Sequence, residues 1–365
     1  MTTYLVSGAT GFVGSALTHR LLQDAAARAR SGQEPHEVRV LARDESAVRR
    51  WAGSGALAQI ASLADPAAIA RAAVGASVIF HCASESSHRA SPDALAWINV
   101  AATENVLNAA RHAGVQRVVQ LSCADVTLAN RDRMNWNERQ TLLGHPLDAC
   151  ARSKLLAEEL ALGSSDRQLQ VTALRPAWVW GPDERRVLPA LCAEALAGRV
   201  SLCGSGQNLV AAVYIDNLID ALHAAASAPD APGRSYHVAD RDIWTAAELY
   251  GQLCDALGLP RPARGIYALS YAAAWLRERT HGNGLWRTEV VRRGRGCLLD
   301  VQAAARDLGY EPTVSTAQGM QLLAAWAKKI GGPAAIARTA RVPAGKAEVE
   351  ALVQAANAAE SSADV

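Results

Sequence analysis

Three glycines near the start of the chain, Gly8, Gly11 and Gly14, restrict the fold more than any other feature of the sequence. They follow a short apolar run, residues 4–6, which is typical of a buried strand, and precede apolar residues at helical spacing. In such a strand–turn–helix unit the helix N-terminus faces an anion, and glycine allows the backbone to approach a pyrophosphate closely. The spacing therefore predicts a dinucleotide-binding turn; the alternative is a glycine turn with only a structural role.

Short apolar runs alternate with helical patterns from residue 1 to about residue 178. The expected strands and helices are residues 4–6, 38–41, 56–60, 66–74, 77–81, 96–113, 118–121, 151–162 and 171–174. This alternation predicts an α/β fold, a Rossmann-type doubly wound parallel sheet with helices on both faces.

A smaller C-terminal substrate-binding lobe is expected beside this sheet. We assign residues 1–178 to the Rossmann domain, with residues 206–228 returning to it. The second lobe then takes residues 179–205 and 229–330. Residues 331–365 contain no aromatic side chain and are interpreted as a flexible tail with one helix near 347–356.

Composition excludes several classes of protein. The net charge is +2, which argues against a nucleic-acid partner. One basic cluster, Arg292, Arg293 and Arg295, is interpreted as a solvated loop, with phosphate or anionic lipid as alternative partners. The seven cysteines include no C-x-x-C pair, which favours reduced thiols in the cytoplasm over disulfides or a metal site. Neither a signal peptide nor a membrane-spanning run is expected.

Several short stretches also occur in a specific order. They are Gly8-x-x-Gly11-x-x-Gly14, Phe80–Ala83, Asn99–Leu107, Val118–Ser122, Ala151–Lys154 with Ala157 and Glu158, Leu174–Pro182, Val213–Asn217, and Asp300 with Leu308–Pro312. In these stretches the chain, over about residues 3–325, resembles the extended short-chain dehydrogenase/reductase family. Asn217 favours its NAD-dependent epimerase/3β-hydroxysteroid dehydrogenase-like branch.

The resemblance implies a nicotinamide cofactor in the Rossmann domain. By position, Ala83 would lie along the cofactor and Lys154 would hold the nicotinamide ribose. The full set of implied cofactor-binding residues is Gly8, Thr10, Gly11, Phe12, Val13, Gly14, Arg43, Ala83, Asn99, Lys154, Pro176 and Ala177.

The end of the second strand bears on which dinucleotide is bound. An acid there would bind a free ribose 2′-hydroxyl, whereas an arginine suits a 2′-phosphate. The sequence places Ala42 at this position and Arg43 next to it. We therefore favour NADP over NAD. The alternatives are a surface arginine, or Asp44 turned toward a ribose.

The catalytic half departs from the family pattern. A tyrosine normally lies four residues before the lysine, where the ammonium lowers the pKa of the phenol. Cys150 lies four residues before Lys154, and Cys123 occupies the position expected for the substrate-orienting hydroxyl. Ser122 is one residue earlier and remains a candidate.

Three interpretations of the two cysteines stay open. A thiol beside Lys154 ionises near neutral pH and carries the proton; Cys123 and Cys150 form a redox pair; or both are buried fillers in a site without catalysis. His145 and Asp125 are alternative proton carriers. Tyr214 and Tyr236 are expected to pack in the second lobe.

The substrate side is apolar. The residues expected to line it or to form core are Trp178, Trp180, Leu188, Leu191 and Leu202. Residues 267–276 form a short apolar helix that packs in the core, covers the pocket or makes peripheral membrane contact. The helices at 96–113 and 151–162 resemble those that pair subunits in this family, and their alanines predict a homodimer.

The sequence thus predicts an NAD(P)(H)-dependent oxidoreductase acting on a hydroxyl or carbonyl of an apolar, steroid-like or long-chain substrate. The alternative is a catalytically degenerate NAD(P)-binding sensor or scaffold. Nucleotide-sugar epimerase or dehydratase chemistry is disfavoured because Cys123, Ala124 and Asp125 lack the hydroxyl–acid pairing that such dehydratases use.

Overall fold

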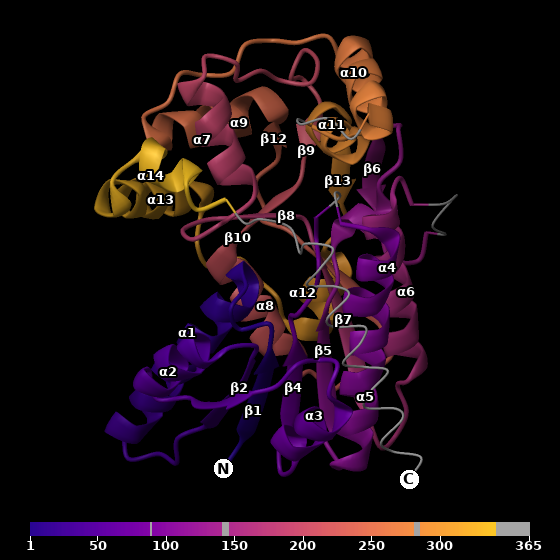
Figure 1. The fold of residues 1–365 in the computed structure, drawn as a ribbon, viewed down its shortest axis with the longest axis vertical. Coiled ribbons are helices and arrows are strands. Elements are labelled where there is room, and N and C mark those ends of the chain that lie inside the picture. The colour runs from indigo at the N-terminus through magenta and orange to yellow at the C-terminus, as the bar shows by residue number, and fades with distance from the viewer. Residues whose placement is uncertain (88–89, 141–145, 281–284, 341–365) are drawn as a thin grey trace.

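A computed structural model describes residues 1–87, 90–140, 146–280 and 285–340 (Figure 1). Its centre is a parallel sheet of seven strands in the order β11-β7-β5-β4-β1-β2-β3. The strands are β1 (Thr3–Ser7), β2 (Glu37–Ala42), β3 (Leu57–Ile60), β4 (Val78–His81), β5 (Arg117–Leu121), β7 (Gln170–Pro176) and β11 (Ser235–Val238). This confirms the predicted Rossmann-type sheet.

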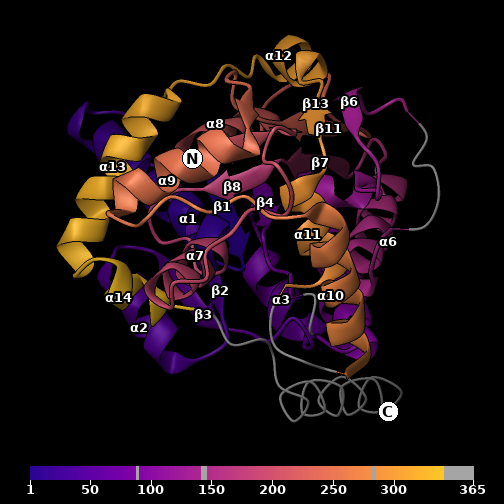
Figure 2. The same ribbon diagram turned by 90° about the horizontal axis from the view of Figure 1, so that it is seen from above.

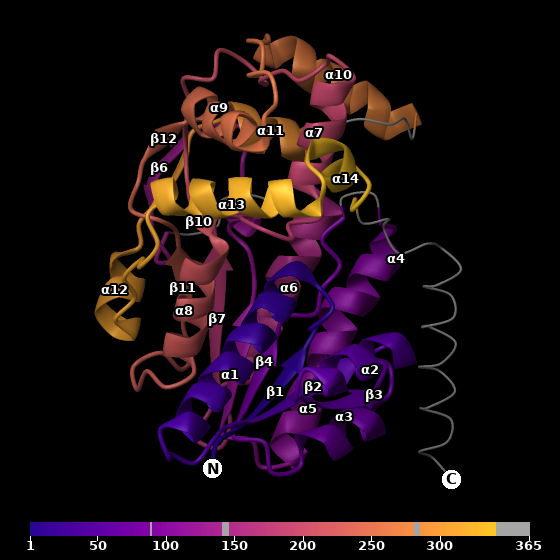
Figure 3. The ribbon, with the colours of Figure 1, turned by 90° about the vertical axis from the view of Figure 1, so that its left-hand side faces the viewer.

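The two faces of the sheet have separate cores because neighbouring strand residues point in opposite directions. Tyr4 and Val6 pack in one core with Leu17, whereas Leu5 packs in the other with Ile69. The helices over the sheet are α1 (Phe12–Arg30), α2 (Glu45–Gly53), α3 (Pro66–Ala73), α5 (Ala102–His112), α6 (Ala149–Gly163) and α8 (Ile215–Ala225). Figure 3 shows α1 and α8 side by side on one face of the sheet.

A smaller lobe lies beyond one end of the sheet (Figures 1 and 2). It contains a four-stranded sheet, β12-β9-β13-β6, and the pair β10-β8. Its strands are β6 (Arg133–Trp136), β8 (Trp178–Trp180), β9 (Leu209–Val210), β10 (Ala212–Tyr214), β12 (Trp244–Thr245) and β13 (Cys297–Leu299). The helices are α7 (Val187–Leu196), α9 (Ala246–Leu257), α10 (Tyr267–Thr280), α11 (Arg287–Gly294), α13 (Thr316–Ile330) and α14 (Pro333–Ala337).

The division of the chain between the two parts differs from the prediction at three places. Strands β9 and β10 lie within residues 206–228, which were assigned to the Rossmann domain, but they belong to the sheets of the smaller lobe. Strand β6 lies in the first 178 residues but pairs with β13 of the smaller lobe. Conversely, β11 was assigned to the lobe but completes the parallel sheet beside β7, with α12 (Gln302–Leu308) packed against it. The β6 and β11 segments are too short to show a periodic pattern of apolar residues. Their sheet can therefore be assigned only from their pairing with distant strands.

The predicted helix 96–113 is two continuous elements preceded by a short helix. After α4 (Pro92–Leu95), a π-helical segment η1 (Ala96–Ala101) leads into α5. The predicted tail begins with order: Ile336 of α14 is fully buried, and α14 packs on α7. The tail helix expected at 347–356 lies outside the described residues. In the ranges that the structure describes, no helix is both long and apolar enough to cross a bilayer.

Candidate active site

A cavity of about 630 Å³ lies at the carboxyl ends of the parallel strands, where they meet the smaller lobe. Most of the predicted site residues line it. These are Gly8, Thr10, Gly11, Phe12, Val13, Gly14, Arg43, Ala83, Ser122, Cys123, Cys150, Lys154, Pro176 and Ala177. The structure therefore brings together residues that are up to 169 positions apart, from Gly8 to Ala177.

The glycine turn has the shape that a bound pyrophosphate requires. Gly8 has a φ of +77°, and a Cβ there would lie 2.5 Å from the backbone nitrogen of Ala83. A Cβ on Gly14 would overlap the carbonyl oxygen of Gly8. Gly11 is the N-cap of α1, and no described side chain caps this helix. The N–H groups at this helix end thus remain available to an anion, so these residues fit a dinucleotide.

Arg43 lines the far end of the cavity together with Ser46 and Arg50. The Asp44 side chain is turned to the helix that follows. Its Oδ1 accepts hydrogen bonds from the Ala47 N–H at 2.8 Å and from the Ser46 hydroxyl at 2.6 Å. These bonds keep the pKa of the Asp44 carboxyl below its usual value. Asp44 is therefore the N-cap of α2, which opposes its predicted alternative role toward a ribose.

Lys154 is buried on α6 and faces the cavity, as does Pro176 at the end of β7. One turn after Lys154, the Glu158 carboxylate receives two hydrogen bonds from the Arg175 Nε, at 2.9 and 3.0 Å. Both side chains of this pair are buried. The bidentate pair fixes the helix that carries Lys154 against the strand that carries Pro176.

Of the three interpretations of the two cysteines, the structure opposes the ionised thiol and the redox pair. Burial raises the pKa of the Cys123 thiol to about 11, and it raises the pKa of the Cys150 thiol further, although Lys154 opposes both shifts. Desolvation therefore outweighs the ammonium, and both thiols are neutral at pH 7. All seven cysteines lie in the described ranges and are unpaired, so no Cys123–Cys150 disulfide is formed.

Ser122 is buried and lines the cavity beside Cys123. Its backbone N–H donates to the carbonyl of Leu174 at 2.8 Å, which fixes the position of the residue. Its hydroxyl has no hydrogen-bond partner among the described residues. Ser122 thus presents a buried donor of the kind that a substrate oxygen satisfies.

Asn99 is not among the residues that line the cavity, and its side chain is bonded to the loop and the helix behind it. Its Oδ1 accepts the Glu85 N–H at 2.8 Å, and its Nδ2 donates to the Glu85 carbonyl at 2.9 Å and to the Ser153 hydroxyl at 2.8 Å. Ser153 in turn donates to the carbonyl of Cys150 at 2.9 Å. Because its amide is fully used, Asn99 positions the Glu85 loop and α6, which revises its predicted role.

The other proposed proton carriers are less suited to that role. Asp125 lines the cavity, but its carboxylate is paired with Arg292, whose Nε donates to Oδ1 at 3.1 Å. Tyr214 is buried against Trp180, and Tyr236 lies in β11, where its hydroxyl donates to Asp230 O. The Tyr236 position corrects its assignment to the second lobe. His145 lies outside the described residues.

The basic cluster is not a solvated loop. Besides the Arg292 pair with Asp125, Arg293 is buried and lies 3.3 Å from the Glu194 carboxylate. Arg295 stacks over the ring of Tyr267 at 4.3 Å. These arginines at the end of α11 tie the lobe to the cavity wall, so the partners of the cluster are in the chain itself.

Sequence reasoning missed five charged cavity residues: Arg50, Glu85, Glu184, Arg185 and Arg186. Glu184 accepts three backbone N–H bonds at the start of α7, and burial raises the pKa of its carboxyl. The sequence offered one indication, for Glu85 alone. This residue follows strand β4 as the glycine turn follows β1, so it is expected at the same end of the sheet. Of the five apolar substrate-side residues, Trp178 lines the cavity; the remaining four, Trp180, Leu188, Leu191 and Leu202, are core.

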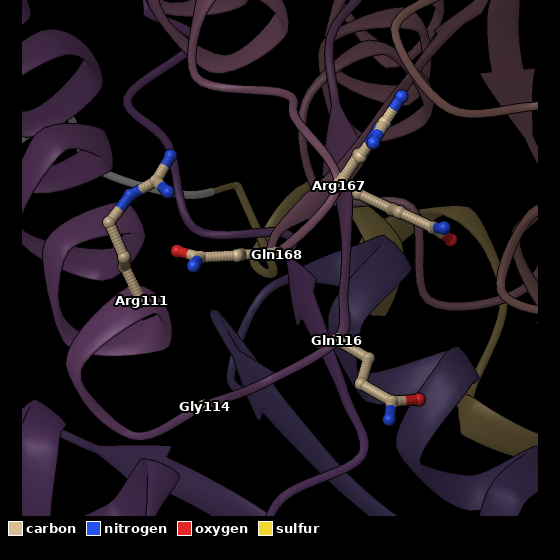
Figure 4. A pocket seen from close by; sticks show the side chains of 6 residues that line it. Arg111, Gly114, Gln116, Arg167 and Gln168 are labelled. Carbon is tan, nitrogen blue, oxygen red and sulfur yellow. The ribbon is translucent and has the colours of Figure 1, made fainter.

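A second cavity, of about 640 Å³, lies at the opposite edge of the sheet, near the starts of β5 and β7. Arg111 and Gln168 extend toward the same space there (Figure 4). The Arg111 guanidinium already binds Asp166 at 2.7 Å and the Ser164 carbonyl at 2.9 Å. This polar pocket joins α5 to the loop before β7, and it holds none of the predicted site residues.

Comparison with known proteins agrees with this geometry. Residues 4–239 match the NAD dependent epimerase/dehydratase family. The chain belongs to this family. It is 31% identical to a 2-alkyl-3-oxoalkanoate reductase of Stenotrophomonas maltophilia over 342 residues, covering 88% of this chain and 98% of the relative.

Two further proteins show the range of chemistry around this fold. A 4-hydroxy-2-methyl-3-oxo-4-farnesyl-3,4-dihydroquinoline-1-oxide ketoreductase of Stigmatella aurantiaca is 28% identical over 87% of this chain and 94% of its own. The crystal structure of a dTDP-glucose 4,6-dehydratase double mutant from Streptomyces venezuelae, with NAD bound, has a TM-score of 0.70 and 25% identity. It covers 89% of this chain and 97% of that one.

Proposed function

We propose that the protein is an NAD(P)(H)-dependent oxidoreductase acting on a hydroxyl or carbonyl of an apolar substrate. The observation that carries the proposal is a single cavity that joins the glycine turn, Lys154 and the unpartnered Ser122 hydroxyl. A bound nicotinamide supplies or accepts the hydride. Ser122 orients the substrate oxygen by a hydrogen bond, Lys154 holds the ribose, and the buried walls exclude water.

Within apolar substrates we favour a long-chain 3-oxo acid over a steroid. Arg185 and Arg186 line the cavity on the loop before α7, and guanidinium groups suit a carboxylate. Trp178, stacked on Tyr250 at 5.5 Å, supplies an apolar wall for an alkyl chain. A 2-alkyl-3-oxoalkanoate, the substrate named for the Stenotrophomonas relative, contains both groups.

We further propose that NADP is preferred over NAD. Arg43 and Arg50 line the end of the cavity where the second strand stops, and Ser46 adds a hydroxyl donor. Asp44, the acid nearest to this position, is engaged as a helix cap. Two guanidinium groups at this end of the cavity favour a 2′-phosphate.

The test is turnover. Purified protein is mixed with NADPH or NADH and with long-chain 3-oxo acids, their methyl esters and 3-oxosteroids, and the loss of nicotinamide absorbance is followed. We expect turnover of the free acids with NADPH, lost in Lys154→Ala. Binding of either nucleotide by calorimetry without turnover of any substrate would favour the degenerate sensor or scaffold instead, an alternative that the reductase relatives do not support.

The homodimer remains a proposal, but the alanines of the two helices no longer support it. The helix alanines face the interior of the chain, as Ala109, Ala110 and Ala161 show by their burial. The outward face of α6 carries Leu156, which is 48% exposed. We propose that α5 and α6 pair across this face. Sedimentation of Leu156→Glu should show a monomer where the native chain is a dimer.

Peripheral membrane contact and a cytoplasmic location are likewise proposals. One side of α10 exposes Leu269, Trp275 and Leu276, with Ile266 just before the helix. The Arg279 guanidinium lies 3.9 Å from the Trp275 ring, a pairing suited to an interface with anionic lipid. Leu269→Ser with Leu276→Ser should reduce sedimentation with phosphatidylglycerol vesicles. Seven unpaired thiols suit the reducing cytoplasm.

A further inference from the structure

We propose that Glu85 is the proton donor and acceptor of this site, in the role that a tyrosine has in the resembling family. The inference rests on the proposed oxidoreductase function. Glu85 follows β4, lines the cavity, and is 3% exposed. Its Oε1 accepts the Ser87 N–H at 2.8 Å, and its Oε2 has no hydrogen-bond partner among the described residues.

An unpartnered carboxyl oxygen at this depth needs a reason, because burying such a group without a partner destabilises the fold. Binding a substrate oxygen would supply the missing partner. One carboxyl oxygen is held by Ser87 and the other is buried without a described partner, so Oε2 is the oxygen at which the proposal places the proton. Glu184, the other buried cavity carboxyl, differs because both of its oxygens accept backbone N–H bonds.

The surrounding contacts hold the backbone of Glu85 in one position, as the positioning of a proton donor requires. The Asn99 amide clamps both the N–H and the carbonyl of Glu85 and reaches Ser153 on α6. The Cys150 Sγ lies 3.9 Å from the Glu85 carbonyl. The main chain of Glu85 is therefore adjacent to the position from which a tyrosine would act. The cysteine side chain ends at Sγ and leaves the proton transfer to its neighbour.

In the direction of reduction, the carbonyl carbon gains a hydride from the reduced nicotinamide dinucleotide, which is thereby oxidised, and a C–H bond forms. The C=O π electron pair moves to oxygen, to which the Ser122 hydroxyl donates a hydrogen bond. The Glu85 Oε2–H bond breaks and the proton forms the new O–H bond. Solvent returns a proton to the carboxylate, and the reverse steps apply to oxidation.

The test compares Glu85→Gln with Glu159→Gln. The first keeps the shape and the acceptor for Ser87 but holds no exchangeable acid proton. The second removes the same charge from an exposed position of α6. We expect kcat to fall about 100-fold or more in Glu85→Gln, within the range for loss of general acid–base catalysis. The Kd for NADPH, measured by calorimetry, should stay unchanged, and Glu159→Gln should match the native chain.

A second readout does not depend on turnover. The infrared difference spectrum between the protein with and without a bound long-chain 3-oxo acid should show a perturbed carboxyl band that is lost in Glu85→Gln and retained in Glu159→Gln. A native kcat in Glu85→Gln, or the absence of that band difference, overturns the assignment while leaving the oxidoreductase intact. No turnover by the native protein overturns both proposals. If Glu85→Gln does not fold, Glu85→Asp decides: withdrawal of the carboxyl by one methylene should lower kcat at least about tenfold, and an unchanged kcat refutes the role.

Discussion

The nucleotide end and the substrate end of the cavity are specified in different ways. At the nucleotide end, backbone groups lie so close together that there is no space for a side chain at Gly8 or Gly14. The glycine spacing in the sequence indicates this directly. At the substrate end, side chains from four distant segments meet, among them Glu85, Ser122, Cys150 and Arg186. A constraint on the backbone of one turn can be predicted from the local sequence. A group of side chains from distant segments cannot, because its arrangement depends on the whole fold.

The largest effect is expected where the two ends are joined, at the buried Glu158–Arg175 pair. Glu158→Gln leaves the Arg175 guanidinium buried without its counter-charge, and this should lower the free energy of unfolding by about 3–5 kcal/mol. Urea unfolding followed by circular dichroism measures it. Glu45→Gln, which breaks the exposed pair with Arg49, should cost less than about 0.5 kcal/mol. Equal losses in both variants would show that the buried pair does not fix α6 to β7.

Gly8→Ala tests the backbone constraint at the nucleotide end of the cavity. The new Cβ would meet the backbone of Ala83 at 2.5 Å in a left-handed conformation, so the turn must shift away from the pyrophosphate. We expect the Kd for NADPH to rise about 100-fold, which is about 2.7 kcal/mol. Gly32→Ala is the matched control, because Gly32 also has a positive φ but no described atom within 4 Å of its Cβ position. Tight nucleotide binding by Gly8→Ala would contradict the backbone constraint.

Arg43→Ala tests how far the nucleotide end extends. Loss of one charge-assisted contact with a 2′-phosphate is worth about 1.5–3 kcal/mol. The ratio of the Kd values for NADPH and NADH should therefore rise about 10- to 100-fold, through weaker NADPH binding alone. Arg49→Ala, an exposed arginine on the neighbouring helix α2, should leave the ratio unchanged. A loss shared equally by both dinucleotides would place Arg43 away from the 2′-position.

The same contrast explains what the sequence predicted. The parallel sheet and the glycine turn were predictable, because strand runs and glycine spacing are local. The roles of Asn99 and Arg292 were not, since each depends on a partner far along the chain, Glu85 or Ser153 for the first and Asp125 for the second. Cys150 illustrates the physical limit. Its spacing from Lys154 left an ionised thiol and a buried filler equally open, because the sign of its pKa shift is set by burial, which the spacing does not determine.

The smallest effect is expected from the thiols at neutral pH. Only the thiolate reacts with iodoacetamide, and burial raises the pKa of Cys123 to about 11. At pH 7 roughly one molecule in 10⁴ carries that thiolate, and this fraction grows about tenfold for each pH unit until the pH approaches the pKa.

Peptide mass spectrometry of alkylated protein should therefore show Cys123 and Cys150 almost unlabelled at pH 7, with Cys123 labelling rising steadily toward pH 10. Urea-unfolded protein, whose thiols have ordinary pKa values, provides the control for reagent and peptide recovery. A labelling rate that levels off near pH 7–8 in the folded protein would mean that Lys154 outweighs desolvation, and the proton carrier would then be a thiol instead of the neighbouring carboxyl.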